Sequence, residues 1–437
     1  MNPKYWNPVI ETLPRERLLE IELKRFREAL RWAKERSPFY RRKLEGIEPE
    51  DIRTVEDVSK VPMTEKDELR EAQEGKEPYL YGDLLAVPPG SLSVFHQTSG
   101  TTGRPVFIPD TYESWQWVVE VWCYILHAAG FRSSDRVFLP FAYNVYIAFW
   151  QGHYAAEKIG CEVVPGGALE TKGRIQKMRD VRATALMNTP TYGLHMAEVA
   201  KEMGVDPRRD LYVKKMICAG EPMPEATRLR LEEEWGADVY NHIGGTEPGG
   251  WGGMCPEKKG LHVIEPHFLF EMVDLETMSK PIPPGAKGVA VITPLGRRCI
   301  PLIRFNLKDI MRAVEDPCPC GRTSIRVDEI EGRMDDLRKI RGVFFTPNMV
   351  EEVIRGRFPE VVEYEITLTQ EGVMPVLTLR VEADPSIAEN SLKEMIARLR
   401  GQLKVRTNLT FEVESIQPGG LPRYTLKSAR FKDLTRK

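Results

Sequence analysis

The chain carries the stretch Thr98-Ser99-Gly100-Thr101-Thr102-Gly103-Arg104-Pro105 between an apolar-alternating run, Leu92 to His96, and a helical pattern that opens near Tyr112. Two glycines let the backbone approach an anion closely, and the hydroxyl side chains of the stretch can donate hydrogen bonds to phosphate oxygens without a counter-charge. No Gly-Lys-Ser/Thr triplet closes the stretch, so it is not the Walker pattern. The residues predict a phosphate-binding loop, with a plain Ser/Thr/Gly surface turn as the alternative.

The length and the net charge of the chain limit the classes of protein to which it can belong. A chain of 437 residues is too long for one core, so we expect two domains. The net charge is −2 at pH 7, so no excess charge draws the chain to nucleic acid or to anionic lipid. The most apolar helical run, Trp115 to Phe131, is interrupted by Gln116, Glu120 and His127, and no cationic segment with an apolar core opens the chain. We therefore expect a cytoplasmic protein without signal peptide or membrane span.

The pattern of apolar residues predicts an α/β fold for most of the chain. Apolar spacing of three and four between Arg15 and Glu35 indicates an amphipathic helix. Beyond the phosphate loop, helical stretches alternate with short β-branched or apolar runs: Arg136 to Leu139, Glu162 to Pro165, Ala185 to Asn188, Lys215 to Ala219 and Asp238 to Asn241. This alternation is typical of a largely parallel sheet. From Glu271 to Val314, strand-like segments divided by proline and glycine favour a barrel or an antiparallel appendage.

The part after Asp336 reads as a separate unit. Its expected elements are a strand and then a helix over Met349 to Arg357, strands over Glu363 to Leu368 and Val376 to Val381, a helix over Ser386 to Gln402, and a strand over Thr410 to Val413. This order predicts a small α+β domain of about a hundred residues.

Several motifs resemble those of one superfamily. The Thr98 to Pro105 stretch resembles the loop of adenylate-forming enzymes, the acyl-CoA synthetase superfamily, in which a carboxylate attacks ATP to give an acyl-AMP. Four further segments match the motifs of that superfamily in the right order: Asn241-His242-Ile243-Gly244-Gly245-Thr246-Glu247, Arg304-Phe305-Asn306-Leu307-Lys308-Asp309, Gly332-Arg333-Met334-Asp335-Asp336 followed by Lys339-Ile340-Arg341-Gly342, and Pro422-Arg423-Tyr424-Thr425-Leu426-Lys427. Five motifs in order are more than chance provides.

Within the superfamily the chain is similar to phenylacetate-CoA ligases, over essentially its whole length. The similarity rests on Tyr5-Trp6-Asn7-Pro8, Ser37 to Lys43, Val61 to Leu69 and Ala219-Gly220-Glu221-Pro222. It implies a large N-terminal adenylate-forming domain of sheets and helices at residues 1–334, and a small mobile α+β domain at residues 335–437. It also implies an ATP-dependent ligase that activates an aryl or arylacetic acid as acyl-AMP and forms the coenzyme A thioester, with Mg²⁺. The oligomeric state stays open, a homodimer included.

The resemblance also assigns roles to residues. Adenylation needs an α-phosphate in line with a carboxylate, a metal on the pyrophosphate and a cation on the developing charge. By resemblance, Thr246 bonds the α-phosphate, Glu247 coordinates Mg²⁺, and Lys427 bridges the carboxylate and the phosphate. Nucleotide contacts are implied for the loop residues Thr98, Ser99, Gly100, Thr101, Thr102 and Gly103, for Ala219, Gly220, Glu221 and Pro222 on the adenine side, for Asn241, His242, Ile243 and Gly244, and for Asp309 and Arg333 on the ribose side. Asp335 resembles the hinge of the small domain, and Gly342 would lie against the pantetheine arm of coenzyme A.

Three features depart from the family pattern. Ile243 stands where the family usually has a tyrosine against adenine, so aliphatic packing replaces base stacking. Leu426 precedes Lys427 where the family usually has glycine, and Lys432 lies nearby. The segment Ala142 to Trp150 aligns with a glycine-rich part of the acyl pocket, and its bulky residues change the volume of that pocket. The acid therefore stays unspecified.

Cysteines indicate a second site, for a metal. The turn Cys318-Pro319-Cys320-Gly321 places two thiolates one residue apart, and Cys255 with His262 stands upstream. A Cys₃His set suits tetrahedral Zn²⁺, and with no open position the zinc would be structural. Some phenylacetate-CoA-ligase-like proteins carry zinc in this region. Three buried free thiols are the alternative, and His267 is a competing ligand.

Two other functions stay open from the sequence. The same motifs serve an adenylating enzyme that passes the acyl group to an amine or to a carrier-protein thiol. A non-catalytic homologue that binds nucleotide or zinc would tolerate Ile243 and Leu426. Such a scaffold has no physical need for Glu247, Asp309 and Lys427 together, which favours an enzyme.

Overall fold

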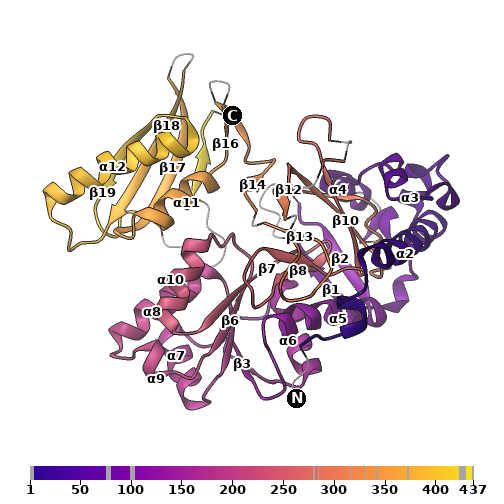
Figure 1. Ribbon diagram of the computed structural model, residues 1–437, viewed down its shortest axis with the longest axis horizontal. Helices are drawn as coiled ribbons and strands as arrows, with labels where there is room; N and C mark the ends of the chain where they lie inside the picture. Colours follow the sequence, from indigo (N-terminus) through magenta and orange to yellow (C-terminus); the bar gives the residue numbers. More distant parts are fainter. Residues whose placement is uncertain are drawn as a thin grey trace.

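The computed structural model describes residues 4–74, 80–98, 104–278, 281–283, 285–314, 316–328, 330–340, 343–371, 374–422 and 430–435. Figure 1 shows a large body built around one extended sheet, with a smaller unit formed by the C-terminal part of the chain beside it. Among the described helices, none combines the length and the apolar character that crossing a membrane requires.

The centre of the large body is a parallel sheet. Its strands lie in the order β4 (Glu162–Pro165), β3 (Arg136–Leu139), β5 (Ala185–Asn188), β6 (Lys215–Cys218) and β7 (Asp238–Gly245). The intervening helices are α6 (Ala148–Ile159), α7 (Thr171–Asp180), α8 (Pro190–Glu202), α9 (Pro207–Asp210) and α10 (Glu225–Trp235). The predicted α/β arrangement is confirmed, because parallel neighbours need such crossovers. The carboxyl ends of β6 and β7 meet at one edge, where Cys218 pairs with Asn241.

Antiparallel strands continue the same sheet beyond β7. They follow in the order β8 (Gly249–Met254), β9 (Leu261–Val263), β13 (Arg326–Val327), β12 (Phe305–Val314), β11 (Lys287–Pro294) and β10 (Phe268–Val273), and β14 (Gly332–Arg333) pairs with β12. The strands expected between Glu271 and Val314 are present and antiparallel. Of the two expected alternatives, a barrel or an antiparallel appendage, the strands form the antiparallel one, and β13 pairs with both β12 and β9, so these strands are joined to the parallel strands in one sheet.

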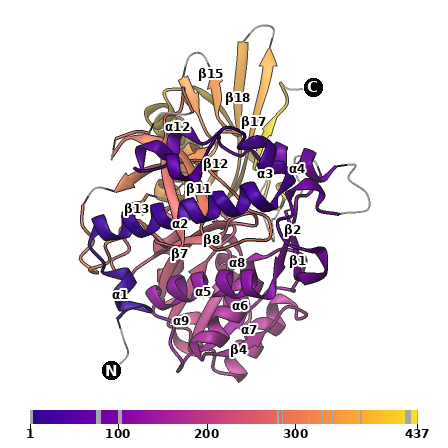
Figure 2. The ribbon, with the colours of Figure 1, turned by 90° about the vertical axis from the view of Figure 1, so that its right-hand side faces the viewer.

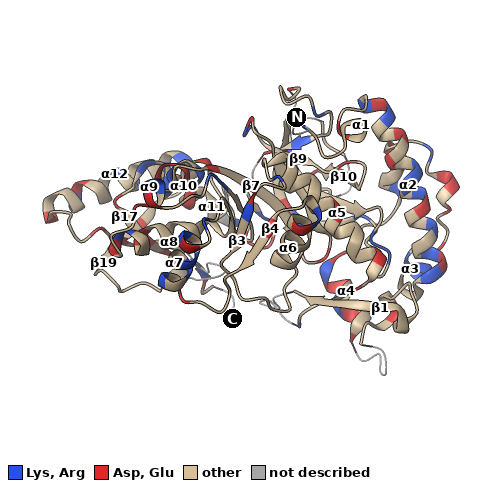
Figure 3. Cartoon of the chain, turned by 90° about the horizontal axis from the view of Figure 1, so that it is seen from below, with Lys and Arg blue, Asp and Glu red and all other residues tan. Residues whose placement is uncertain are grey.

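The first part of the chain covers this sheet. It comprises α1 (Pro8–Glu11), α2 (Arg15–Arg36), α3 (Pro38–Lys43), the 3₁₀ turns η1 (Pro49–Asp51) and η2 (Glu56–Lys60), α4 (Lys66–Gln73), η3 (Gly82–Leu84), η4 (Pro89–Ser91), the hairpin β1 (Leu92–Gln97) and β2 (Phe107–Thr111), and α5 (Tyr112–Ala128). In Figure 2, α2 crosses in front of the antiparallel strands, and Phe26 and Leu30 pack in one cluster with Leu269 of β10. Figure 3 shows charged residues along α2, whereas α5 is mostly uncharged, as expected of a helix inside the core.

The C-terminal unit has its own core. It contains β15 (Arg338–Ile340), β16 (Val343–Phe345), α11 (Asn348–Arg357), β17 (Val361–Glu371), β18 (Met374–Ala383), α12 (Glu389–Thr407), β19 (Phe411–Ile416) and β20 (Phe431–Asp433). Its four-stranded sheet has the order β19-β18-β17-β20. Apolar side chains from α11, α12 and this sheet form a cluster of their own, and α11 contacts α10 of the large body (Figure 1). The α+β interpretation of this part is confirmed.

Candidate active site

The turn between β7 and β8 holds Thr246 and Glu247. The sequence placed Glu247 in a loop after a strand ending at Asn241, but β7 runs on to Gly245 and pairs with β8, so Glu247 lies at the tip of a hairpin. Glycines at both ends of this turn have low strand propensity, and the pairing with β8 overrides it. The hairpin gives Glu247 a rigid base.

Hydrogen bonds from the Arg297 side chain hold this turn in place. Its Nη1 donates to the carbonyl oxygens of Thr246 at 2.9 Å and Glu247 at 2.7 Å, and its Nε and Nη2 donate to the Asp110 carboxylate at 2.9 and 2.6 Å. Both side chains of the ion pair are buried. Burial raises the pKa of Asp110, while the charge of Arg297 opposes that rise. Neither residue was predicted as functional, because Arg297 follows a Pro-Leu-Gly turn and its partners lie far away in the sequence.

A lysine contacts Glu247 directly. The Lys66 Nζ lies 2.8 Å from the Glu247 Oε1, and the Glu247 side chain is otherwise buried. Lys66 is the first residue of α4 and belongs to the Val61 to Leu69 segment, which carried a family resemblance but no assigned role. The structure therefore places a cation, Lys66, beside the residue that was predicted to coordinate Mg²⁺.

A small cleft, with a volume of about 30 Å³, lies at the carboxyl ends of β6 and β7. It is lined by Glu221, Pro222, Met223, Pro224, Asn241, His242, Ile243, Leu261, Ile330 and Asn348. The two segments predicted for the adenine side thus face one space. Gly220 has φ +86°, a left-handed conformation that disfavours other residues at this entrance. Burial raises the pKa of Glu221, one of whose oxygens accepts from the Thr191 backbone N–H at 3.2 Å.

The predicted ribose and hinge residues lie together on β12 and β14. Asp309 pairs with Arg333 across these strands, and the Arg333 Nε lies 3.3 Å from the Asp309 Oδ1. Just beyond, the Lys308 Nζ lies 3.0 Å from the Asp335 Oδ1. The small unit reaches the cleft here, since the Asn348 side-chain amide of α11 donates to the Ile330 carbonyl at 3.0 Å.

The predicted phosphate-binding loop lies between β1 and β2, and only its ends are described. At its base, the Thr98 backbone N–H donates to the Val106 carbonyl at 3.0 Å, and the Val106 N–H donates to the Thr98 hydroxyl oxygen at 2.9 Å. Thr98 therefore closes the hairpin. The other loop residues assigned to phosphate, and two residues of the C-terminal unit, lie outside the described part of the chain: Ser99, Gly100, Thr101, Thr102, Gly103, Gly342 and Lys427.

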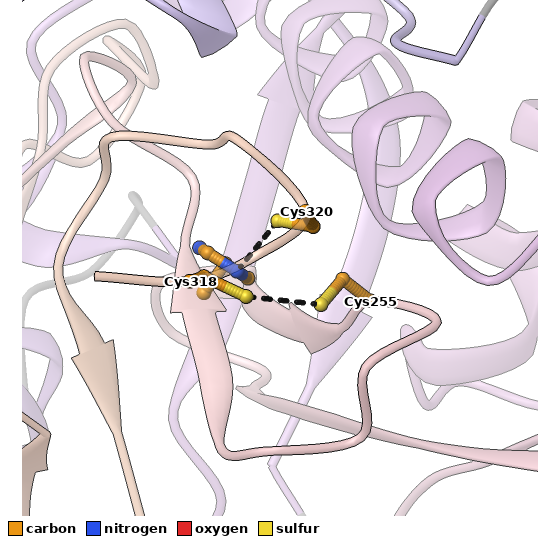
Figure 4. A group of neighbouring side chains, drawn as sticks. Cys255, Cys318 and Cys320 are labelled. Carbon is orange, nitrogen blue, oxygen red and sulfur yellow. Dashed lines mark hydrogen bonds between the residues drawn. The ribbon is translucent and has the colours of Figure 1, made fainter. Parts of the chain in front are cut away.

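The four proposed zinc ligands form one buried cluster. Their ligand atoms, from Cys255, His262, Cys318 and Cys320, all lie within 4.8 Å of one another. Figure 4 shows the three cysteines converging, with Cys255 and Cys318 sulfurs 3.6 Å apart, and the Cys320 sulfur lies 3.4 Å from the His262 Nε2.

Neighbouring groups set the orientation of this cluster. The Ser324 hydroxyl lies 3.0 Å from the His262 Nδ1, which leaves the Nε2 of that ring to face the sulfurs. The competing His267 packs instead against the rings of Trp117 and Tyr124, with centroids 5.8 and 5.1 Å away. Of the two histidines, His262 is therefore the one whose ring nitrogen faces the cysteine sulfurs.

Comparisons with known proteins bear on both domains. The family model for AMP-binding enzymes matches residues 35–293, and the model for the AMP-binding enzyme C-terminal domain matches residues 342–435. The chain is 33% identical to a phenylacetate-coenzyme A ligase of Thermus thermophilus, over 96% of each chain. It is 29% identical to a phenylacetate-coenzyme A ligase of Escherichia coli, over 97% of each.

Among solved structures, the chain resembles a 2-hydroxyisobutyryl-CoA ligase in its postadenylation state, with an acyl-AMP bound. The TM-score is 0.92 at 28% identity, over 99% of this chain and 93% of the other. Against the same ligase in its thioesterification state, with coenzyme A, the TM-score falls to 0.73 over 99% and 92%.

Proposed function

The chain belongs to the AMP-binding enzyme family and is an ATP-dependent acyl-CoA ligase, and from that premise we propose that it activates an aryl or arylacetic acid. The full-length similarity to phenylacetate-coenzyme A ligases carries this proposal. A group of aromatic side chains that pack against one another also supports the proposed aryl substrate. Trp150, from the segment that departs from the family's acyl pocket, packs against Tyr143 and Tyr154 with ring centroids 4.4 and 6.3 Å away, and Trp115 of α5 lies 5.9 Å from Tyr154.

The β7–β8 turn supports the first half-reaction. Thr246 and Glu247 project from a turn that Arg297 fixes, so a nucleotide held there meets groups whose positions are already set. The Glu247 carboxylate, oriented by Lys66, is a ligand of the kind that Mg²⁺ prefers, and the ion would neutralise pyrophosphate charge. Asp309 would bind the ribose, with Arg333 beside it. Lys427 completes the proposal as the cation between carboxylate and phosphate.

The arrangement of the two domains supports a division near residues 334 and 335. The higher TM-score against the postadenylation structure favours the state that follows acyl-AMP formation. Asp335 follows β14, the last strand paired with the large sheet, and precedes β15 of the small unit. We propose it as the hinge, with its ion pair to Lys308 holding this state. Gly342 would then meet the pantetheine arm after rotation.

The acid is tested by measuring pyrophosphate release over a panel of carboxylic acids, with and without coenzyme A. We expect ATP- and Mg²⁺-dependent release with an aryl or arylacetic acid, and a thioester only when coenzyme A is present. Release with aliphatic acids alone would overturn the aryl assignment. Transfer to an amine or a carrier protein in place of coenzyme A would favour the alternative acceptors.

A structural zinc ion is the second part of the proposal. Three thiolates and one imidazole give a closed tetrahedral set, which suits Zn²⁺ and leaves no position for substrate. The cluster joins the β8–β9 hairpin to the β12–β13 connection, and 63 residues separate Cys255 from Cys318. The ion would therefore cross-link the antiparallel part of the sheet.

We expect one zinc per chain in protein purified without chelators, because closed thiolate sites bind tightly and their binding free energy adds to folding. Cys320→Ser should release the metal and lower the unfolding temperature. Cys161→Ser is the matched control, since Cys161 is a buried free cysteine away from the cluster, and its sulfur donates to the Arg132 carbonyl at 3.1 Å. Elemental analysis without stoichiometric zinc, or equal metal content in both variants, would contradict the assignment.

A further inference from the structure

One side chain, that of Arg338, contacts both the proposed hinge and the strand that follows Lys427. Arg338 lies on β15, three residues after Asp335. Its Nε donates to the Asp433 Oδ2 at 2.6 Å, and its Nη1 donates to the main-chain carbonyls of Asp335 at 2.5 Å and Leu337 at 3.1 Å. A single guanidinium therefore joins two segments that lie almost a hundred residues apart in the chain.

The contact with the hinge fixes the direction of one carbonyl group. The turn after β14 is closed by two main-chain hydrogen bonds, from the Asp336 N–H to the Arg333 carbonyl at 3.0 Å and from the Leu337 N–H to the Met334 carbonyl at 3.3 Å. Neither of these bonds uses the Asp335 carbonyl. Rotation about the bond between the Cα and the carbonyl carbon of Asp335 would turn this oxygen away from Arg338. The hydrogen bond therefore favours the domain arrangement observed here over a rotated one.

The other contacts of Arg338 are with β20. Its ion pair with Asp433 is largely buried, since the two side chains are 13% and 9% exposed. Burial opposes ionisation, but hydrogen bonds from Thr435 and Arg338 lower the pKa of Asp433, so the carboxylate is charged at neutral pH. The guanidinium also lies 5.7 Å from the ring centroid of Phe431. The first and the last residue of β20 thus both contact Arg338.

The placement of β20 limits the reach of Lys427. Arg430, directly before β20, follows Lys427 by three residues, and three residues of chain span at most about 11 Å. The Arg430 guanidinium donates to the Glu363 carboxylate at 2.6 and 3.2 Å, and its carbonyl accepts from the Ile366 N–H at 2.7 Å, both on β17. These bonds join β20 to the sheet of the small domain, and Arg338 joins that sheet to the hinge.

A second contact at the hinge is weaker than that of Arg338. In the ion pair between Asp335 and Lys308, the Asp335 side chain is more than half exposed, so water and salt screen the attraction. The pair between Arg338 and Asp433 is shielded from solvent, and a planar guanidinium bonds several acceptors at once in fixed directions. Arg338 therefore has the larger effect on the position of the small domain.

We propose that Arg338 is a positioning residue for the first half-reaction, which holds the Asp335 main chain and β20 in the arrangement that places Lys427 at the acid and ATP. The inference rests on the roles proposed above for Asp335 and Lys427. Arg338 itself touches no substrate in this proposal. Its loss releases the hinge towards the arrangement that forms the thioester, so it should slow adenylation and spare the second half-reaction.

Arg338→Met tests this role, because methionine keeps an apolar stem beside Phe431 and removes the guanidinium. Losing hydrogen bonds to charged groups shifts an equilibrium about 10- to 100-fold, and we expect pyrophosphate release from acid and ATP to fall by that factor. Thioester formation from pre-made acyl-AMP and coenzyme A should stay at the rate of the unaltered enzyme or exceed it. Arg338→Lys keeps the charge without the planar set of donors, so its loss of adenylation should be intermediate.

Arg355→Met is the matched control. The Arg355 side chain of α11 is 11% exposed, pairs with Glu351 at 3.3 Å, donates to the Val361 carbonyl at 3.1 Å and lies 5.6 Å from the ring centroid of Tyr364. These are the same kinds of contact that Arg338 makes, but none of them involves the hinge or β20. This variant should lower the unfolding temperature about as much as Arg338→Met and leave the ratio of the two half-reaction rates unchanged.

The domain arrangement can also be measured without substrate. Nitroxide labels at Leu229→Cys of α10 and Val405→Cys of α12, both exposed positions, give an interdomain distance distribution by pulsed electron paramagnetic resonance. The seven native cysteines are buried, so the labels attach at the introduced ones. We expect Arg338→Met to shift this distribution and Arg355→Met to keep it.

The outcomes separate this inference from the proposed function. Equal losses in both half-reactions for Arg338→Met, or an unshifted distance distribution, would show that Arg338 serves the fold alone and would overturn the inference while the ligase function stands. If the unaltered enzyme forms no AMP from any acid, the proposed function fails. In that case a shifted distribution still supports the contact between Arg338 and the hinge, and an unshifted one overturns it.

Discussion

Arg297→Met is expected to reduce adenylation about 100-fold and to destabilise the large domain. The variant leaves Asp110 as a buried carboxylate without its partner, and breaking such a pair costs about 3–5 kcal/mol. It also frees the Thr246 and Glu247 carbonyls, so the turn that presents both side chains can shift. A misplacement of about 1 Å at a catalytic group is enough for a 100-fold loss. Pyrophosphate release and thermal unfolding measure the two effects.

The double variant Arg297→Met/Asp110→Leu separates stability from positioning. Replacing a buried ion pair by apolar residues is often neutral, so most of the lost stability should return. The carbonyls of Thr246 and Glu247 still lack their donor, so activity should stay low and the KM for ATP should stay raised. Recovery of both stability and activity would show that Arg297 serves the fold alone.

The sequence predicted the parallel strands closely because each is a short apolar run between helices. β3, β4 and β5 have the predicted bounds, and β6 differs from its prediction by one residue. The sequence predicted the antiparallel strands but not their positions in the sheet, because β13 pairs with β9, which lies about 65 residues earlier in the chain. Local patterns carry no information about such partners.

The residues of the candidate site likewise include some that the sequence predicted and some that it did not. Residues within motifs, such as Glu247 and Asp309, could be selected from the sequence because their neighbours resemble a known family. Arg297 and Lys66 could not, since their roles come from contacts with a turn distant in the sequence. The proposed metal ligands differ in this respect, because a Cys-x-Cys turn with an upstream cysteine and histidine restricts the choice, and the four side chains do lie together.

Lys427→Ala is expected to lower acyl-AMP formation from acid and ATP about 100- to 1,000-fold. Negative charge gathers between the carboxylate and the α-phosphate in that step, and losing one group that stabilises such charge costs about this much. Thioester formation from pre-made acyl-AMP and coenzyme A should continue at the rate of the unaltered enzyme, because the thiol attack needs no cation at this position. The two half-reactions are measured separately, by pyrophosphate release and by AMP release from the supplied acyl-AMP.

Lys432→Ala is the matched control for this prediction. Lys432 lies five residues further along the same segment and forms an ion pair with Glu365, half-exposed on the small domain. The Glu365 carboxylate is buried but keeps Arg380 at 3.7 Å when Lys432 is lost, so the variant should leave both half-reactions near those of the unaltered enzyme and lower the unfolding temperature only slightly. A selective loss of adenylation in Lys432→Ala with none in Lys427→Ala would move the catalytic role to Lys432. Equal loss of both half-reactions in Lys427→Ala, with a lowered unfolding temperature, would mean that Lys427 supports the fold of the small domain and not the chemistry of the first step.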